Sequence, residues 1–487
     1  MKKQNIMKTS KYFRCRNIER WIKLCICLCI LISCKEKTSK IKGTTCADNS
    51  RPNIIFILTD DQRWDALGYV SNRVITPEMD RLAREGTYFS HAIATTPICA
   101  ASRASIFTGQ QERTHGYTFG KPALDSSTID HVYASQLKKN GYHTGYFGKL
   151  GVKIDQPNRL FETADFYDRN TDKKNKEGYF YKTLEKDTVH LTRYTGEQGL
   201  NFIKNAPKDR PFCLTLSFSA PHAHDPSEQQ YFWQEDQESF YKDQTMELPK
   251  LAKLKYYDSL PQVVKEGFNR KRWEWRFNTP EKYQQSVKGY YRMIKGIDNE
   301  LGRIRNLLAF RGLDENTIII LMGDNGCYLG ERQLAGKWLM HDNSIRVPLI
   351  IYSPGYDHKE IDDMVLNLDV PSTILDISEV ERPSSYQGKS LMPYVKGENK
   401  DVRKMVLIEH LWDFDKIPAS EGIRTSKYKY FRYIGIENSE ELYNLEKDPE
   451  ETINLAQKRD EHKKLIELRE ACDSMIHLYS KGNTNEL

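Results

Sequence analysis

Short apolar segments alternate with helical segments along most of the chain. The continuous apolar run Asn53–Thr59 is typical of a strand that is buried on both faces. A helix should follow, because Thr76-Pro77 supplies an N-cap and a first-turn proline and Gly86 supplies a stop. The alternation continues, with helices expected at 132–140, 195–205 and 280–308 and strands at 143–148, 212–219, 317–322 and 348–352. It predicts an α/β fold in which helices cover both faces of a mostly parallel central sheet.

The pattern changes beyond residue 400. The short runs Met405–His410 and Lys427–Tyr433 predict antiparallel strands, and a charged helix is expected from about 460 to 479. We therefore predict a main domain over residues 51–395 and a small C-terminal α+β subdomain over residues 396–487.

The first 33 residues differ from the rest in charge and hydropathy. Eight basic residues and one acid precede the apolar run Leu24–Ile32, which is too short to cross a bilayer and has the length of a secretory signal core. Leu31-Ile32-Ser33-Cys34 resembles the lipobox of bacterial lipoproteins, in which the cysteine becomes the lipidated first residue. We expect a signal peptide over 1–33, a polar tether over 34–50 and an exported lipoprotein anchored through Cys34, facing the periplasm or the cell surface. An ordinary cleaved signal or an uncleaved anchor is the alternative.

The charge of the remaining chain argues against a polyanionic partner. The formal net charge is +6, but residues 1–33 contribute +7, which leaves −1 on the rest. A protein that binds nucleic acid needs a basic face on its folded domain. We therefore expect no nucleic-acid partner.

Acidic or imidazole side chains directly follow three of the predicted strands. Asp60-Asp61 follows the first strand, Asp324-Asn325 a later one, and His222 the strand between them. Adjacent carboxylates repel each other unless a cation or a proton lies between them. Oxygen ligands without a thiolate or histidine cluster favour Ca²⁺ or Mg²⁺ over zinc. Taken alone, an Asp pair more often caps a helix or a turn, and it is the joint placement that favours a metal site.

One cysteine lies in a context that suggests chemistry. Beyond the leader and Cys34, the chain has Cys46, Cys99, Cys213, Cys327 and Cys472. This odd number without close pairs implies no disulfide framework. Cys99 stands just before a predicted helix that runs to Gly109, where the helix dipole favours an anion, and Arg103 adds a positive charge. The pattern indicates an anion site with a reactive residue, although a lone cysteine is usually a buried, inert thiol.

The residues around Cys99 resemble the signature of the type I sulfatases. That signature is Cys, any residue, Pro or Ala, Ser, Arg and an apolar run ending in Thr-Gly, and Cys99–Gly109 reads CAASRASIFTG. Further segments match the family in the same order: Arg51–Asp61, Gly148-Lys149, Ala220-Pro221-His222, Gly323–Gly326, Leu329–Glu331, Gly336–Trp338 and Arg346–Ile350. The segments Gly422–Tyr433, Glu441–Leu445 and Asp448-Pro449 are similar to the small C-terminal domain of these enzymes. The resemblance covers about residues 51–395 as a catalytic domain.

The resemblance implies an alkaline-phosphatase-like fold and hydrolysis of sulfate esters. A maturation enzyme would oxidise Cys99 to formylglycine (3-oxoalanine), whose hydrate attacks sulfur with one hydroxyl and uses the other to expel sulfate. The implied metal is Ca²⁺, with Mg²⁺ as the second choice. Its implied ligands are Asp60, Asp61, Asp324, Asn325 and an oxygen of the modified Cys99.

The remaining catalytic roles also follow from the resemblance. Arg103, Lys149 and Lys337 would be the fixed cations that stabilise charge on the sulfuryl oxygens. His222 would donate a proton to the sulfate or to the leaving oxygen.

The chain departs from the family pattern at two positions. Family members often read Gly-Lys-Trp-His-Leu-Gly, whereas Gly148-Lys149-Leu150-Gly151 lacks the histidine that assists release of sulfate. Another histidine, such as His115 or His143, could replace it. Ala101 stands where proline is common, which favours an anaerobic radical maturase over an aerobic maturation enzyme.

The expected substrate is a sulfated glycan. Residues 231–278 are irregular and rich in aromatic residues, and we interpret them as an insertion that lines the pocket with Trp273 and Trp275, because sugars stack on aromatic faces. Further candidate sugar contacts are His115, His224, Arg332, His341 and the segment His410-Leu411-Trp412.

Two other functions stay open at this point. The chain could be a phosphatase, phosphodiesterase or phosphonate monoester hydrolase of the same superfamily. The missing histidine and the aromatic insertion would also fit an inactive, sugar-binding lipoprotein.

Overall fold

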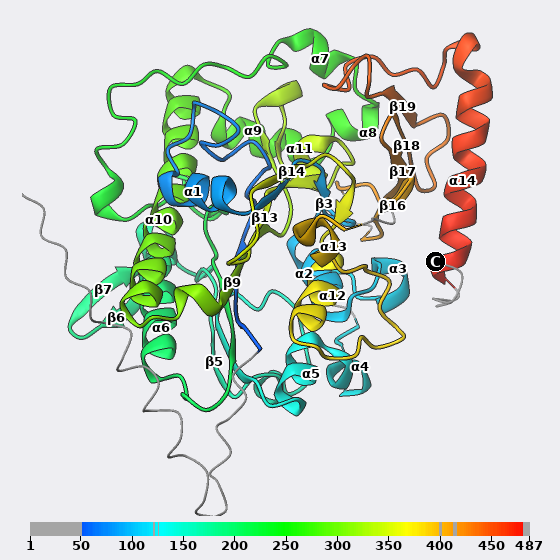
Figure 1. Cartoon of the computed structure of the whole chain (residues 1–487). Coiled ribbons are helices and arrows are strands. Elements are labelled where there is room, and N and C mark those ends of the chain that lie inside the picture. The colour runs from blue at the N-terminus through cyan, green and yellow to red at the C-terminus, as the bar shows by residue number, and fades with distance from the viewer. Residues whose placement is uncertain (1–50, 120–121, 125, 399–401, 413–415, 481–487) are drawn as a thin grey trace, which may run out of the picture. The chain divides into compact units, whose positions relative to one another are not determined.

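A sheet of eight strands in the order β14-β2-β13-β9-β1-β8-β4-β5 organises the main part of the molecule (Figure 1). Its strands are β1 (Asn53–Thr59), β2 (Thr87–Phe89), β4 (His143–Gly148), β5 (Thr163–Phe166), β8 (Phe212–Ser217), β9 (Thr317–Gly323), β13 (Leu349–Tyr352) and β14 (Lys359–Ile361). The five consecutive strands from β9 to β5 are parallel. Only β13 runs against its neighbours β9 and β2. The predicted mostly parallel sheet is therefore confirmed.

The computed structural model describes residues 51–119, 122–124, 126–398, 402–412 and 416–480. The predicted signal peptide, the tether, Cys34 and Cys46 lie outside the described residues. No helix among the described residues combines the length and the apolar character that a membrane span requires.

Helices cover both faces of the sheet because alternate residues of the central strand β1 point in opposite directions. Ile55 and Ile57 pack in the cluster formed with α1 (Pro77–Glu85), α6 (Leu191–Asn205) and α10 (Pro280–Phe310). The intervening residues of β1 pack in a second cluster with α2 (Cys99–Thr108), α5 (Tyr133–Lys139) and α12 (Asp369–Ile377). This arrangement explains why the strand reads as a continuous apolar run.

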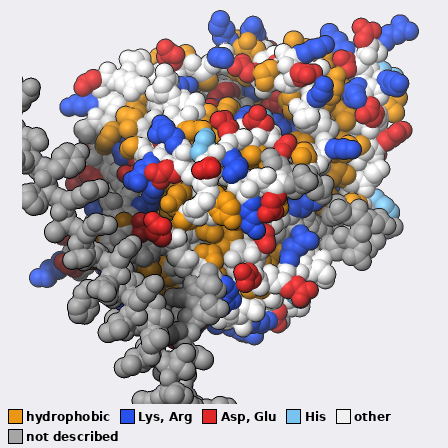
Figure 2. Space-filling model, in the orientation of Figure 1, with side chains coloured by type: hydrophobic (Ala, Val, Ile, Leu, Met, Phe, Trp, Pro, Cys, Tyr) orange, Lys and Arg blue, Asp and Glu red, His pale blue; other side chains and the backbone are white. Residues whose placement is uncertain are grey.

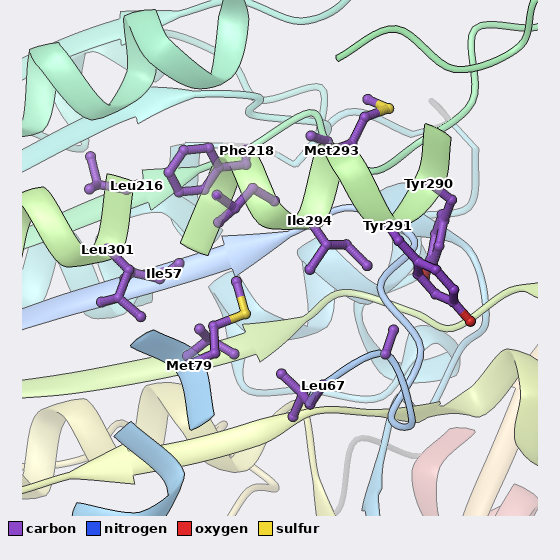
Figure 3. Packing of buried hydrophobic residues seen from close by; sticks show 14 of the residues in the cluster. Ile57, Leu67, Met79, Leu216, Phe218, Tyr290, Tyr291, Met293, Ile294 and Leu301 are labelled. Carbon is purple, nitrogen blue, oxygen red and sulfur yellow. The ribbon is translucent and has the colours of Figure 1, made fainter. Parts of the chain in front are cut away.

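The long helix α10 shows how sequence and packing agree (Figure 3). The Thr279 side chain caps its N-terminus and Pro280 fills its first turn. The buried residues Tyr290, Ile294 and Leu301 recur at helical spacing and face Ile57 and Leu216 of the sheet. Truncating such a side chain to alanine should cost about 2–5 kcal/mol of stability.

The C-terminal part forms a separate antiparallel sheet, as the two predicted strands suggested. Its strands follow the order β16 (Met405–His410), β17 (Ser420–Thr425), β18 (Tyr428–Tyr433) and β19 (Glu440–Asn444). One face packs on α14 (His462–Ser480) through Leu407, Tyr430 and Leu468, and the other packs on the main part through a cluster that includes Phe431 and Tyr328. The boundary between residues 395 and 396 stays a prediction.

The aromatic segment 231–278 is more regular than its sequence pattern indicated. It contains the short helices η3 (Glu235–Gln237), α7 (Leu254–Asp258), α8 (Gln262–Lys265) and α9 (Phe268–Arg276). Many of its aromatic residues join the core on the α10 side of the sheet, including Tyr231, Phe232 and Phe277.

The remaining elements are short and connect these layers. They are β3 (Ala92–Ile93), α3 (Glu112–His115), α4 (Ser126–His131), η1 (Pro157–Arg159), η2 (Asn175–Gly178), β6 (Phe180–Leu184), β7 (Asp187–His190), η4 (Asp314–Asn316), β10 (Tyr328–Leu329), η5 (Glu331–Gln333), β11 (Ala335–Gly336), α11 (Asp342–Ile345), β12 (Arg346–Val347), β15 (Val365–Leu366), α13 (Met392–Lys396) and η6 (Arg459–Glu461). On the face shown in Figure 2, basic and acidic side chains are interspersed over the described surface.

Candidate active site

Four adjacent parallel strands end at the same edge of the sheet and deliver the charged residues predicted from the sequence. Thr59 of β1 pairs with Gly323 of β9, so that Asp60 and Asp324 emerge side by side. On the other side of β1, β8 pairs with β4 in a register that sets Ser217 opposite Gly148, which precedes Lys149. Ligand sites of open α/β sheets gather at such carboxyl ends.

Three carboxylates and one carboxamide meet at this edge. The Asp61 backbone has φ 65° and its N–H donates to Asp324 Oδ1 at 3.1 Å. Asn325 Nδ2 donates to Asp61 Oδ1 at 2.7 Å. Asp60, Asp324 and Asn325 are fully buried. The acids predicted to bind a metal are therefore brought together.

Three buried cations neutralise these carboxylates. Lys149 Nζ lies 2.5 Å from Asp60 Oδ2, and Lys337 Nζ lies 2.5 Å from Asp61 Oδ1 and 3.8 Å from Asp60 Oδ1. Arg103 Nε contacts Asp324 Oδ2 at 2.8 Å. We call Asp60, Asp61, Cys99, Arg103, Lys149, Asp324, Asn325 and Lys337 together the strand-end centre.

The acids of the strand-end centre have unequal proton affinities. Burial, with the charge of neighbouring Asp60, raises the pKa of Asp324 to about 6. Burial also acts to raise the pKa of Asp60, but the ammonium groups of Lys149 and Lys337 outweigh it and lower that pKa. The crowded negative charge thus favours either a shared proton or a bound cation.

Unpaired oxygen atoms test whether a metal ion fits. Among the described residues, Asp60 Oδ1 and Asn325 Oδ1 are buried without a hydrogen-bond partner. Ligand atoms of Asp60, Asp61 and His222 all lie within 4.8 Å of one another. Buried polar atoms are normally paired, and oxygen donors suit a hard divalent cation. The residues present therefore fit Ca²⁺ or Mg²⁺.

Cys99 lies at the N-terminus of α2, beside the carboxylates. The helix begins at Cys99 itself, one residue earlier than the sequence pattern indicated, and Cys99 lines a cavity with Lys149 and Lys337. The N-cap residue Ile98 has no side-chain acceptor, so the positive end of the helix dipole stays available to an anion. Trp338 N donates to Pro97 O at 3.0 Å, which ties the segment carrying Lys337 to the turn before Cys99.

His222 completes the inner part of the cavity. Its Nδ1 lies 2.6 Å from the Ala223 carbonyl and must donate to it, because a carbonyl only accepts. Nε2 then points to Asp61 Oδ2 at 3.5 Å. Burial and the cations Arg169 and Lys337 hold the pKa of His222 well below its usual value. In the neutral ring Nε2 is an acceptor, so the predicted proton donation requires the doubly protonated ring.

The cavity above Cys99 has a volume of about 440 Å³. We call eight of the further residues that line the cavity, beyond the strand-end centre and His222, the outer wall. The outer wall consists of Phe119, Asp168, Arg169, Asp225, Phe268, Arg272, Trp338 and Trp412. The cavity is large enough for one sugar ring.

Sequence reasoning missed most of the outer wall. Asp168 and Arg169 follow the edge strand β5. The alternation of polar and apolar residues in Thr163–Phe166 was the one sequence signal that could have indicated this strand and hence their position. Arg272 lies on α9, inside the segment interpreted as irregular. No local pattern could have placed Arg272 beside Lys337, because the contact is made through Asn269 Nδ2, which donates to the Lys337 carbonyl at 2.8 Å.

The two histidines considered as replacements for the missing one lie elsewhere. His143 begins β4, at the opposite end of the strand from Lys149, and pairs with Glu162 at 2.8 Å. His115 Nε2 contacts Ser105 Oγ at 3.1 Å, six residues or roughly 9 Å along α2 from Cys99. Among the described residues that line the cavity, His222 is the only histidine.

A side chain, such as a histidine, would not fit at Gly151, two residues after Lys149. Gly151 lines the cavity with φ 70°, and a Cβ atom there would lie 2.6 Å from Arg103 Cδ. A side chain at residue 151 would therefore require both a strained backbone and a shift of Arg103.

The structure does not bring the other predicted sugar contacts to the cavity, with one exception. Trp412 lines it, whereas Trp273 stacks under Arg270 and lines a different surface pocket. Trp275 does not line the cavity and contacts Phe268 edge-on.

Three further candidates have structural contacts instead. His224 is fully buried, with Nε2 2.7 Å from the Lys173 carbonyl. Arg332 donates to the Glu450 and Glu451 carbonyls, and His341 lies between Tyr328 and the C-terminal sheet. Arg332 and His341 thus connect the main part to the C-terminal part.

Two family models match the chain. A model described as Sulfatase matches residues 52–380, and a model described as N-sulphoglucosamine sulphohydrolase, C-terminal, matches residues 330–477. Together they cover the strand-end centre, the outer wall and the C-terminal sheet.

Curated relatives match over most of their length. An arylsulfatase of Clostridium perfringens is 27% identical, with 89% of this chain and 96% of that protein covered. An N-acetylglucosamine-6-O-sulfatase of Bacteroides thetaiotaomicron is 27% identical, with 90% and 88% covered. An ulvan-active sulfatase of Formosa agariphila is 26% identical, with 93% and 88% covered.

Solved structures share the fold. One matching structure is that of a protein in complex with its substrate D-glucosamine-2-N,6-O-disulfate. It has a TM-score of 0.74 at 24% identity, and the match covers 90% of this chain and 99% of that chain. The phosphonate monoester hydrolase of Agrobacterium radiobacter matches with a TM-score of 0.72 at 20% identity, covering 88% and 96%. The predicted alkaline-phosphatase-like fold is thus confirmed.

Proposed function

This chain belongs to the sulfatase family and is a sulfuric ester hydrolase, and we propose that it removes sulfate from sulfated glycans with a centre built on Cys99 and Ca²⁺. One observation carries this proposal. Cys99, three buried cation–carboxylate pairs and two unpaired buried oxygens meet at the carboxyl edge of four parallel strands. The arrangement suits an anionic substrate that reacts beside a metal ion.

The metal site would use oxygen ligands already gathered in the structure. Asp60, Asp61, Asp324 and Asn325 would hold Ca²⁺, with an oxygen of the modified Cys99 as a further ligand. The ion would supply a fixed positive charge beside the sulfuryl oxygens. The unpaired Oδ1 atoms of Asp60 and Asn325 support this assignment.

Cys99 would act in its oxidised form. Formylglycine, as its hydrate, supplies an oxygen nucleophile that can later release sulfate by collapsing to the aldehyde. An unmodified thiol would be left as an S-sulfonated cysteine with no such route. Ala101, which is fully buried against Trp338 and Ile98, keeps the pattern that a radical maturase accepts. We propose such a maturase as a partner of the newly made chain.

The fixed cations would bind the sulfate group and stabilise the charge that develops on its oxygens. Lys149 and Lys337 line the cavity, and Arg103 is held between Asp324, the Lys149 carbonyl and Ser217 Oγ. Their positions are fixed before substrate binds, which is the condition for effective electrostatic catalysis. His222, oriented by the Ala223 carbonyl, would exchange a proton with the leaving oxygen through Nε2.

Sulfated glycans are the substrate class that the relatives and the cavity support. The relatives include an N-acetylglucosamine-6-O-sulfatase and an ulvan-active sulfatase. The outer wall offers aromatic faces, with the Phe119 and Trp412 rings stacked at 4.7 Å between centroids. An exported, lipid-anchored form would meet such glycans outside the cytoplasm, and we propose this location from the lipobox at Cys34.

Parallel assays on three nitrophenyl esters test the reaction class. We expect p-nitrophenyl sulfate to be cleaved faster than p-nitrophenyl phosphate and p-nitrophenyl phenylphosphonate by protein purified from its native host. Dominant phosphate or phosphonate turnover would favour the related hydrolases instead. Absence of all turnover in a protein that binds sulfated sugars would favour a binding lipoprotein.

A further inference from the structure

The outer wall carries two arginines that the sulfate site does not use. Arg169 and Arg272 both line the cavity, and their side chains are only 9% exposed. Cys99 and His222 line the same cavity. The two arginines therefore lie close to the place where the sulfate ester reacts.

The carboxylates around these arginines are shared among more cations than they can neutralise. Asp225 pairs with both Arg272 and Arg276. Asp168 lies 3.5 Å from Arg169 and 3.5 Å from Lys149. Arg169, Arg272 and Arg276 are thus paired with only two carboxylates, Asp168 and Asp225, and Asp168 is also close to Lys149. The three arginines therefore carry at least one positive charge more than the two carboxylates neutralise.

Each arginine also retains hydrogen-bonding capacity. The Nε atoms of Arg169 and Arg272 are buried and make no hydrogen bond among the described residues, although Arg169 Nε lies 3.5 Å from Asp168 Oδ1. Arg169 Nη1 donates to the Ala223 carbonyl, and Arg272 Nη2 donates to Asp225. An arginine fork can bind a carboxylate or a sulfate with two parallel bonds. The pair is therefore incompletely satisfied within the protein.

The position of Arg272 is fixed from several sides. Its guanidinium lies 4.3 Å from the centre of the Trp338 ring and 5.2 Å from that of Phe268. A Cβ atom at Gly336, which has φ 85°, would approach Arg272 Nη1 to 2.9 Å. Glycine at this position lets Arg272 pack against the backbone beside Lys337. Rigid packing of this kind is what a specific binding group requires.

We propose that Arg169 and Arg272 bind a second acidic group of the substrate. The preferred substrate is then a sulfated sugar that carries another sulfate, or a carboxylate, on the ring bearing the scissile ester. This inference rests on the proposed sulfatase function and narrows its substrate class. Both acidic groups share the same chemistry toward a guanidinium, and the experiment distinguishes them.

Matched substrates test the proposal in the wild-type protein. One pair is a hexosamine 6-sulfate with an acetylated amine against the same sugar with a sulfated amine. The other pair is a hexose sulfate against the corresponding hexuronate sulfate. Because a hydrogen bond to a charged group contributes about 1.5–3 kcal/mol, kcat/KM for sulfate release should be about 10- to 100-fold higher for the doubly acidic member of at least one pair. A higher kcat/KM for the sugar with the sulfated amine identifies the second group as a sulfate, and a higher kcat/KM for the hexuronate identifies it as a carboxylate.

Variants assign the preference to the two arginines. Arg169→Gln and Arg272→Gln should each reduce the preference to within about threefold, and Arg272→Lys should restore part of it. Arg270→Gln is the matched control, because Arg270 lies on the same helix but stacks on Tyr257 and Trp273 outside the cavity. It should keep the full preference. Thermal unfolding of each variant checks that it is folded.

The failures of the two proposals are distinguishable. If singly and doubly acidic sugars are cleaved equally well in both pairs, the second acidic site is overturned while the sulfatase function stands. A preference that survives in both glutamine variants also overturns the assignment. If no sulfated sugar and no p-nitrophenyl sulfate is cleaved, the proposed function itself fails.

Discussion

The two ends of the cavity are built in different ways. The strand-end centre consists of buried ion pairs fixed by four strand ends and the first turn of α2. The outer wall combines a strand end, the helix α9 of the aromatic segment and the ring of Phe119, which is 51% exposed. The inner end thus holds charges in fixed places, whereas the outer end, under the proposed function, would select the sugar. Inner variants should therefore affect kcat and outer variants mainly specificity.

The largest expected effect is loss of the reacting residue. Cys99→Ala should reduce sulfate release by about 10⁴-fold or more, because no other residue can supply the covalent centre. The unfolding temperature should change little, because the substitution removes a single buried atom. Substantial turnover by this variant would contradict the role of Cys99.

Removing one fixed cation should have the next largest effect. Lys337→Met should lower kcat by about 10²–10³-fold, as removal of a single preorganised charge does elsewhere. Lys295→Met is a matched control, because Lys295 is an equally buried lysine that pairs with Asp298 at 2.9 Å outside the cavity. Both variants should lose stability, but only Lys337→Met should lose kcat. Equal losses of kcat would show that the effect is structural.

Calcium should stabilise the strand-end centre as well as support turnover. With free Ca²⁺ at 100 times its Kd, the folded protein should gain about 2.7 kcal/mol over the chelated protein. Thermal unfolding with EDTA and with added Ca²⁺ measures this gain, and Asn325→Ala should reduce it by removing an unpaired oxygen donor. An unfolding temperature that is the same with EDTA, with Ca²⁺ and with Mg²⁺ would contradict the proposed metal site.

The outer wall should contribute a pH-dependent stability through Asp225. Burial acts to raise the pKa of Asp225, but Arg272 and Arg276 outweigh it and lower that pKa from 3.8 to about 2. A lowered acid pKa stabilises the folded state above the unfolded pKa and loses this effect as the pH falls through about 2. Asp225→Asn should therefore be roughly 2 kcal/mol less stable in urea at pH 7, and the difference should shrink between pH 4 and pH 2. If the stability difference between the wild-type protein and Asp225→Asn did not change with pH, Asp225 would not be stabilised as a carboxylate by Arg272 and Arg276.

The smallest effects should come from the tryptophans that lie outside the cavity. Trp273→Ala and Trp275→Ala should leave KM for a sulfated oligosaccharide within about twofold, because neither lines the cavity. Trp412→Ala should raise KM by about tenfold, since stacking on an aromatic face contributes about 1 kcal/mol or more. If Trp273→Ala and Trp275→Ala raised KM more than Trp412→Ala does, the interpretation that Trp273 and Trp275 bind the sugar would be restored.

Much of the strand-end centre could be predicted because its residues directly follow buried strands. Once Asn53–Thr59 and Thr317–Gly323 are parallel neighbours, Asp60 and Asp324 must meet at one edge. The order of the strands was not predictable from periodicity, and neither was the reversed direction of β13. The family signature supplied the roles of Lys149 and Lys337, which no spacing rule gives.

The outer wall could not be predicted for a physical reason. Arg272 reaches the cavity because Asn269 bonds to the backbone on both sides of Gly336, in a contact between segments more than 60 residues apart. Trp273 and Trp275, on the same helix, point to other surroundings, since neighbouring positions of a helix face different directions. Aromatic composition alone therefore pointed to a segment that does contribute to the cavity wall, through Phe268 and Arg272, but not to these side chains.

The central claim is that Cys99 becomes an aldehyde that reacts with sulfate esters. The tryptic peptide Glu85–Arg103 contains this residue and no internal Lys or Arg. Mass spectrometry of this peptide, from active protein purified from its native host, tests the claim most directly. We predict the mass of formylglycine at residue 99 and labelling by a hydrazide reagent. An active preparation in which residue 99 is wholly an unmodified thiol would contradict the account.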